Sequence, residues 1–230
     1  EQAWQSFAPV NAMTFAAGDR LHILAAGRFD RTLRISGTGS KTAPIEVHFA
    51  PGRYDFSPAQ AIRRQFNISN TNADPEGEKA IGILLENARH VRLHGHGARI
   101  VFRGKAIQVC IDHSEDIKIA GLKFDYHRPT VSEYKVTAVA GDSFELEVHP
   151  DSQYEIRDGQ LIWIGEGWET TGNLTQELNP ATNDVRRTRI SLAGMQIEEV
   201  APFHLRATGE SRMQPGRIYQ VRDTFRDYAA

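Results

Sequence analysis

Apolar and polar residues alternate with a period of two in two stretches of the chain that resemble each other. The stretches are Leu85-Glu86-Asn87-Ala88-Arg89-His90-Val91-Arg92-Leu93-His94-Gly95 and Ile111-Asp112-His113-Ser114-Glu115-Asp116-Ile117-Lys118-Ile119-Ala120-Gly121. Equivalent positions, such as Leu93 and Ile119, lie a constant 26 residues apart. Alternation of this kind predicts short strands, and a repeat of this length predicts the stacked turns of a solenoid.

Each copy is therefore expected to form one coil of a right-handed parallel β-helix, which we predict for about residues 30–128 of an all-β chain. The first 29 residues show no clean period and are expected to cap this domain, which spans residues 1–128 in total. We predict that the apolar positions of the coils face inward: Leu85, Val91, Leu93, Ile111, Ile117, Ile119, Leu122 and Phe124. The polar positions between them are predicted to face outward: Glu86, Arg92, Asp112 and Lys118.

The pattern changes after Arg128-Pro129, where short strands are separated by tight-turn residues. These turns are Gly141-Asp142, Asp158-Gly159 and the segment from Pro180 to Asn183. Such residues supply the backbone conformations that hairpins need, so residues 129–221 are expected to form an inserted antiparallel β-barrel-like module. Residues 222–230 are expected to begin a return to the β-helix. Because two or three coils are few for a solenoid, we also expect further coils beyond Ala230, with this chain as an N-terminal portion.

Composition excludes several classes of function. The formal charge of −2, the pI near 6.6 and the scattered lysines and arginines argue against a nucleic-acid partner. Cys110 is the single cysteine, so no intramolecular disulfide can form. No run of about 18 apolar residues predicts a membrane-spanning helix, and no membrane partner is expected.

Several stretches resemble the glycoside hydrolases of family 110, which are α-1,3-galactosidases built on a parallel β-helix interrupted by β-barrel modules. Besides the two repeats, the matching stretches are Ala50-Pro51-Gly52-Arg53-Tyr54-Asp55-Phe56, Asn67-Ile68-Ser69-Asn70-Thr71-Asn72, Leu122-Lys123-Phe124-Asp125-Tyr126, Leu161-Ile162-Trp163-Ile164-Gly165-Glu166-Gly167-Trp168 and Val221-Arg222-Asp223. The Ile-Ser-Asn and Gly-Glu-Gly-Trp segments are the most specific among them.

The resemblance implies exo-acting, inverting hydrolysis of terminal α-1,3-linked galactose, with no metal and no other cofactor. Inversion needs a carboxylic acid and a carboxylate base about 6.5–9.5 Å apart. The resemblance places these acids on coils beyond Ala230, so no residue of this chain is named as catalytic. It also implies a galactose-containing oligosaccharide or polysaccharide as partner and a secreted or periplasmic location. Association of identical chains through the flat faces stays open.

Seven residues are candidates for substrate binding. Asp125, Tyr126 and His127, followed by the cation of Arg128, lie at the predicted junction of helix and barrel, where they would either contact a sugar or hold the modules together. Trp163, Glu166 and Trp168 combine aromatic rings with a carboxylate, although tryptophan is also a large core residue. Asn70 belongs to an asparagine-rich loop that would either cap the helix edge or reach the substrate.

Two further groups have competing interpretations. His94 and His96, with His90 and His113 nearby, invite a metal site, but no carboxylates accompany them at ligand spacing, and we expect an exposed polar ladder instead. Glu86 and Asp112 occupy equivalent repeat positions. They would form either a carboxylate pair with one raised pKa or two turn-forming side chains, of which the second is expected.

Two other classes of function compete with the hydrolase. A β-helical polysaccharide lyase needs a base and cations to neutralise a uronate, but strand parity spreads Lys118, Lys123, Arg89, Arg92 and Arg103 over different faces. A non-catalytic glycan-binding or stalk module would need no acid/base pair at all.

Overall fold

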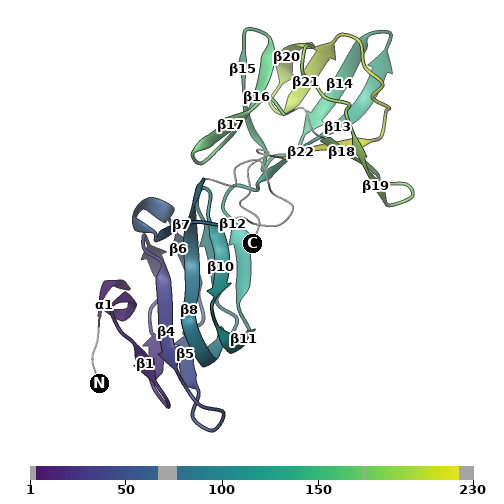
Figure 1. Cartoon of the computed structure of the whole chain (residues 1–230). Coiled ribbons are helices and arrows are strands. Elements are labelled where there is room, and N and C mark those ends of the chain that lie inside the picture. The colour runs from purple at the N-terminus through teal and green to yellow at the C-terminus, as the bar shows by residue number, and fades with distance from the viewer. Residues whose placement is uncertain (1–3, 67–76, 173–174, 223–230) are drawn as a thin grey trace. The chain divides into compact units, whose positions relative to one another are not determined.

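The computed structural model describes residues 4–66, 77–172 and 175–222. These residues are almost entirely β-structure and form two compact units, residues 4–127 and residues 128–222 (Figure 1). Among them, no helix has both the length and the apolar character that a membrane crossing requires. Apart from Arg222, the segment expected to return to the β-helix lies outside the described residues.

The first unit contains a short helix, a 3₁₀ turn and two sheets. Its helical elements are α1 (Ala8–Asn11) and η1 (Pro58–Gln60). The first sheet contains β1 (Phe15–Ala16), β2 (Arg20–Ile23), β4 (Leu33–Thr38), β5 (Ile45–Phe49), β7 (Arg63–Gln65), β8 (Glu78–His94), β10 (Ile107–Asp112) and β11 (Glu115–Ala120). The second sheet contains β3 (Gly27–Phe29), β6 (Arg53–Phe56), β9 (Arg99–Phe102) and β12 (Lys123–Tyr126). The chain thus passes alternately from the first sheet to the second.

The two repeated stretches pair with each other in parallel, as the alternation predicts. Leu85 pairs with Ile111 between β8 and β10, and Leu93 pairs with Ile119 between β8 and β11. β4 and β5 pair in parallel with the other edge of β8. The one antiparallel pair among the described strands of this unit joins β7 to the start of β8.

The repeat also fixes the corners of the chain. Asn87 and His113, which are 26 residues apart in the sequence, both have a positive φ, and so do His90 and Asp116. Asn, Asp and His tolerate this left-handed conformation better than most residues. Gly95 serves a different purpose, because a Cβ there would lie 2.3 Å from the carbonyl carbon of Gly121 on the neighbouring copy. Glycine therefore permits the close approach of the two repeated segments at this corner.

The apolar side chains of both sheets meet in one core. Leu85, Val91 and Leu93 are fully buried, and Ile117, Ile119, Leu122 and Phe124 pack against the same core while partly exposed. The prediction for Ile111 is wrong, because 52% of its surface is exposed. Ile111 lies on β10, on whose outer edge no other described strand is paired, so nothing in the described chain covers it.

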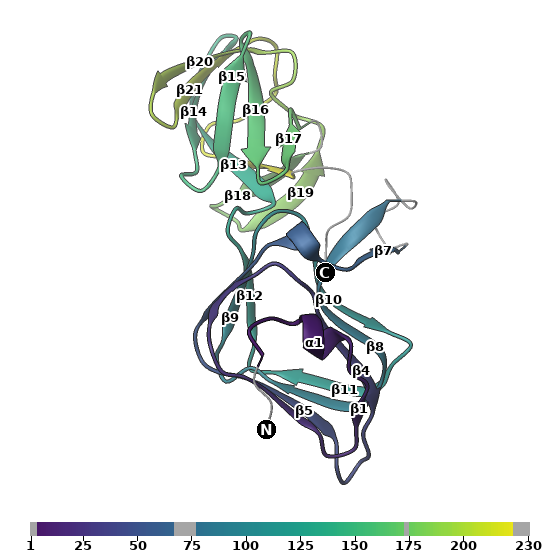
Figure 2. The ribbon, with the colours of Figure 1, turned by 90° about the vertical axis from the view of Figure 1, so that its left-hand side faces the viewer.

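The N-terminal region differs from the predicted cap. Only α1 lies over the stack, where it buries Val10 and contacts β4. Figure 2, which looks along the stack, shows α1 inside the outline formed by the two sheets. Residues 15–29 instead form β1, β2 and β3, which pair in parallel with β4, β5 and β6. Strands of two to four residues are too short to show a period in the sequence, which explains the difference.

The second unit is antiparallel throughout. Its seven-stranded sheet contains β13 (Val131–Ala140), β14 (Ser143–Val148), β18 (Thr175–Asn179), β19 (Asp184–Thr188), β20 (Gln196–Ala201), β21 (His204–Thr208) and β22 (Ile218–Arg222). A smaller sheet contains β15 (Gln153–Arg157), β16 (Gln160–Gly165) and β17 (Trp168–Thr170). The three predicted hairpin turns are confirmed, since β13 pairs with β14, β15 with β16 and β18 with β19. Positive φ angles at Gly141, Asp158 and Asn183 explain the choice of turn residues.

Candidate functional site

Asp125 lies on the outward face of the second sheet of the first unit. It occupies the register position of Val101 on β9, which in turn pairs with Asp55 on β6. Two residues earlier on the same strands, Arg53, Arg99 and Lys123 form a neighbouring row. Of the five cations considered in the sequence analysis, only Lys123 belongs to this row, because Lys118 and Arg92 pair with each other on the first sheet.

Each carboxylate of this face is paired with a guanidinium group. Arg53 Nη2 lies 2.7 Å from Asp55 Oδ1, and Arg99 forms an ion pair with Asp125. The hydrogen bond from Arg53 lowers the pKa of Asp55, and the hydrogen bond from Arg99 lowers the pKa of Asp125. Such ionised groups accept or donate charge-assisted hydrogen bonds, which suits the recognition of sugar hydroxyls. They do not suit a general acid, which needs a raised pKa.

Tyr126 does not share this face with Asp125. The Tyr126 ring packs against Phe102, with 5.9 Å between centroids, and its hydroxyl donates to the Ala106 carbonyl at 3.0 Å. Neighbouring residues of a strand point to opposite sides, so Tyr126 turns toward the core while Asp125 turns outward. His127 is exposed, and its backbone N–H donates to the Phe102 carbonyl. The expected cluster of Asp, aromatic ring and cation is therefore not formed by adjacent residues.

Arg128 and both tryptophans belong to the interior of the second unit. Arg128 is buried and donates to the Ile164 carbonyl at 2.9 Å and to Ser132 Oγ at 2.7 Å. Its guanidinium carbon lies 5.0 Å from the Trp168 ring centroid. Trp163 is 1% exposed and Trp168 is 8% exposed. The expected stacking of a sugar on these two rings is not supported, because both rings belong to the core of this unit and leave almost no exposed surface for a sugar.

Glu166 and Asn70 are the two remaining candidates for substrate binding. Glu166 lies in the turn between β16 and β17 and is partly exposed. Asn70 lies outside the described residues, as does the rest of the asparagine-rich loop over 67–72. The predicted role of that loop therefore stays a prediction.

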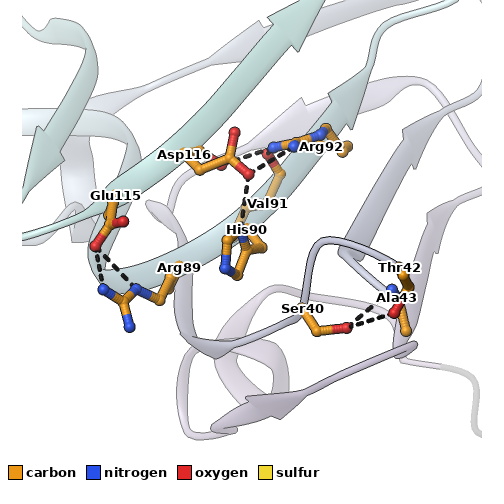
Figure 3. A network of polar contacts seen from close by, with 9 residues as sticks. All are labelled: Ser40, Thr42, Ala43, Arg89, His90, Val91, Arg92, Glu115 and Asp116. Atoms are coloured by element: carbon orange, nitrogen blue, oxygen red, sulfur yellow. Dashed lines mark hydrogen bonds and ion pairs between the residues drawn. The ribbon is translucent and has the colours of Figure 1, made fainter.

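Charged side chains also join β8 to β11 (Figure 3). Arg89 forms an ion pair with Glu115, while His90 Nδ1 and Arg92 Nη2 each lie 2.7 Å from Asp116 Oδ2. These contacts, led by the hydrogen bond from Arg92, lower the pKa of Asp116 to about 2. The network therefore holds β8 and β11 together and keeps its carboxylates ionised.

Glu86 and Asp112 are neighbours in register, as predicted from the repeat. However, Arg34 Nε lies 2.8 Å from Glu86 Oε2, and His113 Nδ1 lies 2.8 Å from Asp112 Oδ1. Each carboxylate thus has its own partner, and an acid/base pair formed by the two is not supported.

A histidine row on β2, β5 and β8 was missed by the sequence analysis. His22 pairs with His48, and His48 pairs with His94, so the three imidazoles lie at one register position. Partial burial, followed by the neighbouring imidazoles of His94 and His22, lowers the pKa of His48. The signal was present, because His22 and His48 lie 26 residues apart, but short flanking strands hid this third copy of the repeat.

The chain is similar to one protein-family model and to several known proteins. A family model described as GLAA-B beta-barrel domain I matches residues 132–218, within the antiparallel second unit. Alpha-1,3-galactosidase A of Akkermansia muciniphila is 37% identical over 230 residues, which cover 98% of this chain and 38% of that protein. Alpha-1,3-galactosidase A of Bacteroides fragilis is 32% identical over 83% of this chain and 32% of that protein.

A third relative, alpha-1,3-galactosidase B of Parabacteroides distasonis, is 29% identical over 77% of this chain and 30% of that protein. The chain spans about a third of the length of these curated relatives. The resemblance indicated by the sequence motifs is confirmed.

Proposed function

Because the chain is related to the α-1,3-galactosidases A and B of glycoside hydrolase family 110, we propose that it is part of an inverting exo-α-1,3-galactosidase. The observation that carries this proposal is an identity of 37% extending over 98% of the chain, and so through both units. The substrate would be a galactose-containing oligosaccharide or polysaccharide, and the enzyme would act in a secreted or periplasmic location.

The first unit is proposed to be the opening coils of a right-handed parallel β-helix. Parallel pairing of β1, β4, β8 and β10 and of β3, β6, β9 and β12 supports this fold, as does the alternation of the chain between the two sheets. Parallel strands require crossover connections, and these are right-handed in nearly all proteins.

The outward face of the second sheet is proposed to contact the glycan. Asp125 and Asp55, each held by an arginine, offer ionised oxygens and guanidinium N–H groups on one surface. Paired groups of this kind are pre-oriented, so binding a hydroxyl costs little side-chain entropy. His127, which is exposed, and Glu166, which is partly exposed, remain further candidates, whereas the buried Trp163 and Trp168 are left out.

The acid and base of hydrolysis are proposed to lie outside this chain. A general acid at neutral pH needs a carboxyl group with a raised pKa. Among the described carboxyl groups, every clear shift is downward: Asp55, Glu115, Asp116, Asp125 and Glu169. This is what supports placing both catalytic groups elsewhere in the full-length parent.

A lyase or a binding module is less well supported. The row of Arg53, Arg99 and Lys123 resembles a cationic surface for uronates, but Asp55 and Asp125 neutralise its two arginines. The relatives are named as galactosidases rather than as lyases or binding proteins.

The test is an assay of the full-length parent on an α-1,3-linked galactobiose, followed by proton NMR during the first turnovers. Inversion releases β-galactose first. Release of α-galactose first would show a retaining mechanism and contradict the proposed inversion. An unsaturated product from a uronate polymer would identify the parent as a lyase. Glycan binding without turnover would identify it as a binding module.

A further inference from the structure

The histidine row forms a stacked column on the outward face of the first sheet. The rings of His22 and His48 have centroids 4.9 Å apart, and those of His48 and His94 have centroids 4.6 Å apart, with interplanar angles of 10° and 11°. Neighbouring strands lie about 4.7–4.9 Å apart, so in-register pairing alone sets this spacing. Identical side chains on successive strands thus bring their ring nitrogens together.

Glu46 adds a carboxylate to this column. It lies two residues before His48 on β5, and side chains two residues apart on a strand share a face. His48 Nε2 lies 3.8 Å from Glu46 Oε2, and His94 Nε2 lies 3.9 Å from Glu46 Oε1. The ligand atoms of Glu46, His48 and His94 all lie within 4.8 Å of one another.

We propose that Glu46, His48 and His94 bind a divalent transition-metal ion of the Zn²⁺ class. Two imidazole nitrogens and one carboxylate oxygen form a three-ligand set that zinc uses, with a fourth position left for water. Ligand bonds of about 2.0–2.2 Å would draw the three atoms closer by small side-chain rotations. The backbone need not move, because the ligands come from two strands already paired in register.

One ligand atom lacks any other partner. His94 Nε2 is buried and has no hydrogen-bond partner among the described residues. A buried polar atom without a partner is costly, and a metal ion would satisfy it. The neighbouring Glu46 oxygen, at 3.9 Å, is too far to accept a hydrogen bond from this nitrogen.

The surroundings orient a second ligand. His48 Nδ1 lies 3.2 Å from His96 Nε2, within hydrogen-bond distance. When Nδ1 carries the proton and donates to His96, the lone pair of His48 Nε2 faces Glu46. A hydrogen bond of this type to the distal nitrogen commonly fixes the tautomer of metal-binding histidines.

Arg20 competes with the metal ion for the carboxylate. Its Nε lies 2.7 Å from Glu46 Oε2, while Oε1 faces His94. The other arginine in register with Glu46 is Arg92, which is already bound to Asp116. Removing Arg20 should therefore strengthen metal binding, an effect that misfolding cannot imitate.

The sequence analysis expected no metal here because no carboxylate lies at ligand spacing beside His94 and His96. The structure supplies Glu46 from 48 residues before His94, across the paired strands β5 and β8. The competing interpretation is a polar column of stacked imidazoles that binds nothing.

The test uses the 230-residue chain without a polyhistidine tag, titrated with Zn²⁺ by calorimetry and with Co²⁺ by visible absorption. One ion per chain and the intense visible bands of four-coordinate Co²⁺ are expected. Losing even an outer-sphere partner costs 10- to 100-fold in metal affinity, so H48A, H94A and E46Q should each weaken Zn²⁺ binding by at least about tenfold. R20A should tighten it.

The matched control is H113A, which removes an exposed histidine on another coil and should leave Zn²⁺ affinity unchanged. E46Q keeps both imidazoles and the side-chain shape, and circular dichroism without metal verifies the fold of each variant. Equal Zn²⁺ affinity in the native chain, E46Q and H94A would overturn the proposal. The readout is metal affinity, so it is independent of whether the parent is a galactosidase.

Discussion

Leu93 on β8 and Ile119 on β11 face each other across two parallel strands, 26 residues apart in the sequence. Leu93 is 1% exposed, whereas Ile119 packs against the same core from a partly exposed position. We expect Leu93→Ala to lower the free energy of unfolding by about 2–5 kcal/mol and Ile119→Ala to lower it by roughly half as much. Urea denaturation followed by circular dichroism measures both, and Ile111→Ala, at an exposed position, should stay within about 0.5 kcal/mol of the native chain.

Gly95→Ala should destabilise the first unit because its methyl group would lie 2.3 Å from the carbonyl carbon of Gly121. Overpacking of this kind costs about 1–3 kcal/mol. The control is Gly27→Ala, since an added Cβ there has nothing within 4 Å. Equal melting temperatures for the two variants would show that the copies are farther apart at Gly95 than described.

Carbon-13 NMR of the side-chain carboxyl groups should find Asp116 titrating at about 2, below its ordinary value of 3.8. The lowered pKa means that the ion pairs stabilise the fold fully above the ordinary value and lose this effect as the pH falls through about 2. Arg92→Ala should move the pKa of Asp116 upward, because Arg92 makes the largest contribution. An unchanged titration in that variant would show that Arg92 does not contact the carboxylate in solution.

In the full-length parent, Asp125→Asn should raise the KM for an α-1,3-galactoside while leaving kcat nearly unchanged. A hydrogen bond to a charged group contributes about 1.5–3 kcal/mol, so the expected increase is about 10- to 100-fold. Asp116→Asn, on a different sheet, is the matched control and should change neither constant. A loss of kcat with unchanged KM would instead identify Asp125 as part of the acid/base pair.

The 230-residue chain alone should release no galactose from an α-1,3-galactoside under conditions in which the full-length parent is active. General acid and general base catalysis each contribute roughly 10²–10⁴-fold, so absence of both leaves no measurable turnover. Turnover by the chain that disappears in Asp112→Asn or Asp125→Asn would place a catalytic carboxylate within these residues.

The sequence predicted the parts of the fold in which the repeat is regular. The alternation over Leu85 to Gly95 and its copy is enough to predict parallel pairing with the correct register. It could not reveal the pairing of β1 with β4 or of β4 with β8, because the offsets there differ from 26, being shorter between Phe15 and Gly37 and longer between Leu33 and Ile83. Regular hairpin turns, in contrast, have a strong local signal, and so the antiparallel pairs were predictable.

The candidate site was less predictable because burial decides which side chains can act. Sequence alone cannot distinguish a tryptophan that binds a sugar from one that fills a core, and Trp163 proved to be a core residue. Neighbouring residues of a strand point to opposite sides, so Asp125 and Tyr126 were predictable as pointing apart. The sequence analysis nevertheless grouped them because they are adjacent in the chain. Glu46 and His94 lie 48 residues apart, and only the pairing of β5 with β8 brings them together. The regular 26-residue offset does not predict this pairing.

The 17-residue strand β8 hydrogen-bonds along one edge to β4 and β5 and along the other to β10 and β11. Successive turns of the chain are therefore fastened to one uninterrupted backbone and cannot fray separately at its centre. In a stack stabilised mainly by contacts between neighbours, opening begins at the outer strands and moves inward. The amides of β8 should accordingly exchange with solvent deuterium most slowly in this unit. This strand would then be the last part of the stack to open.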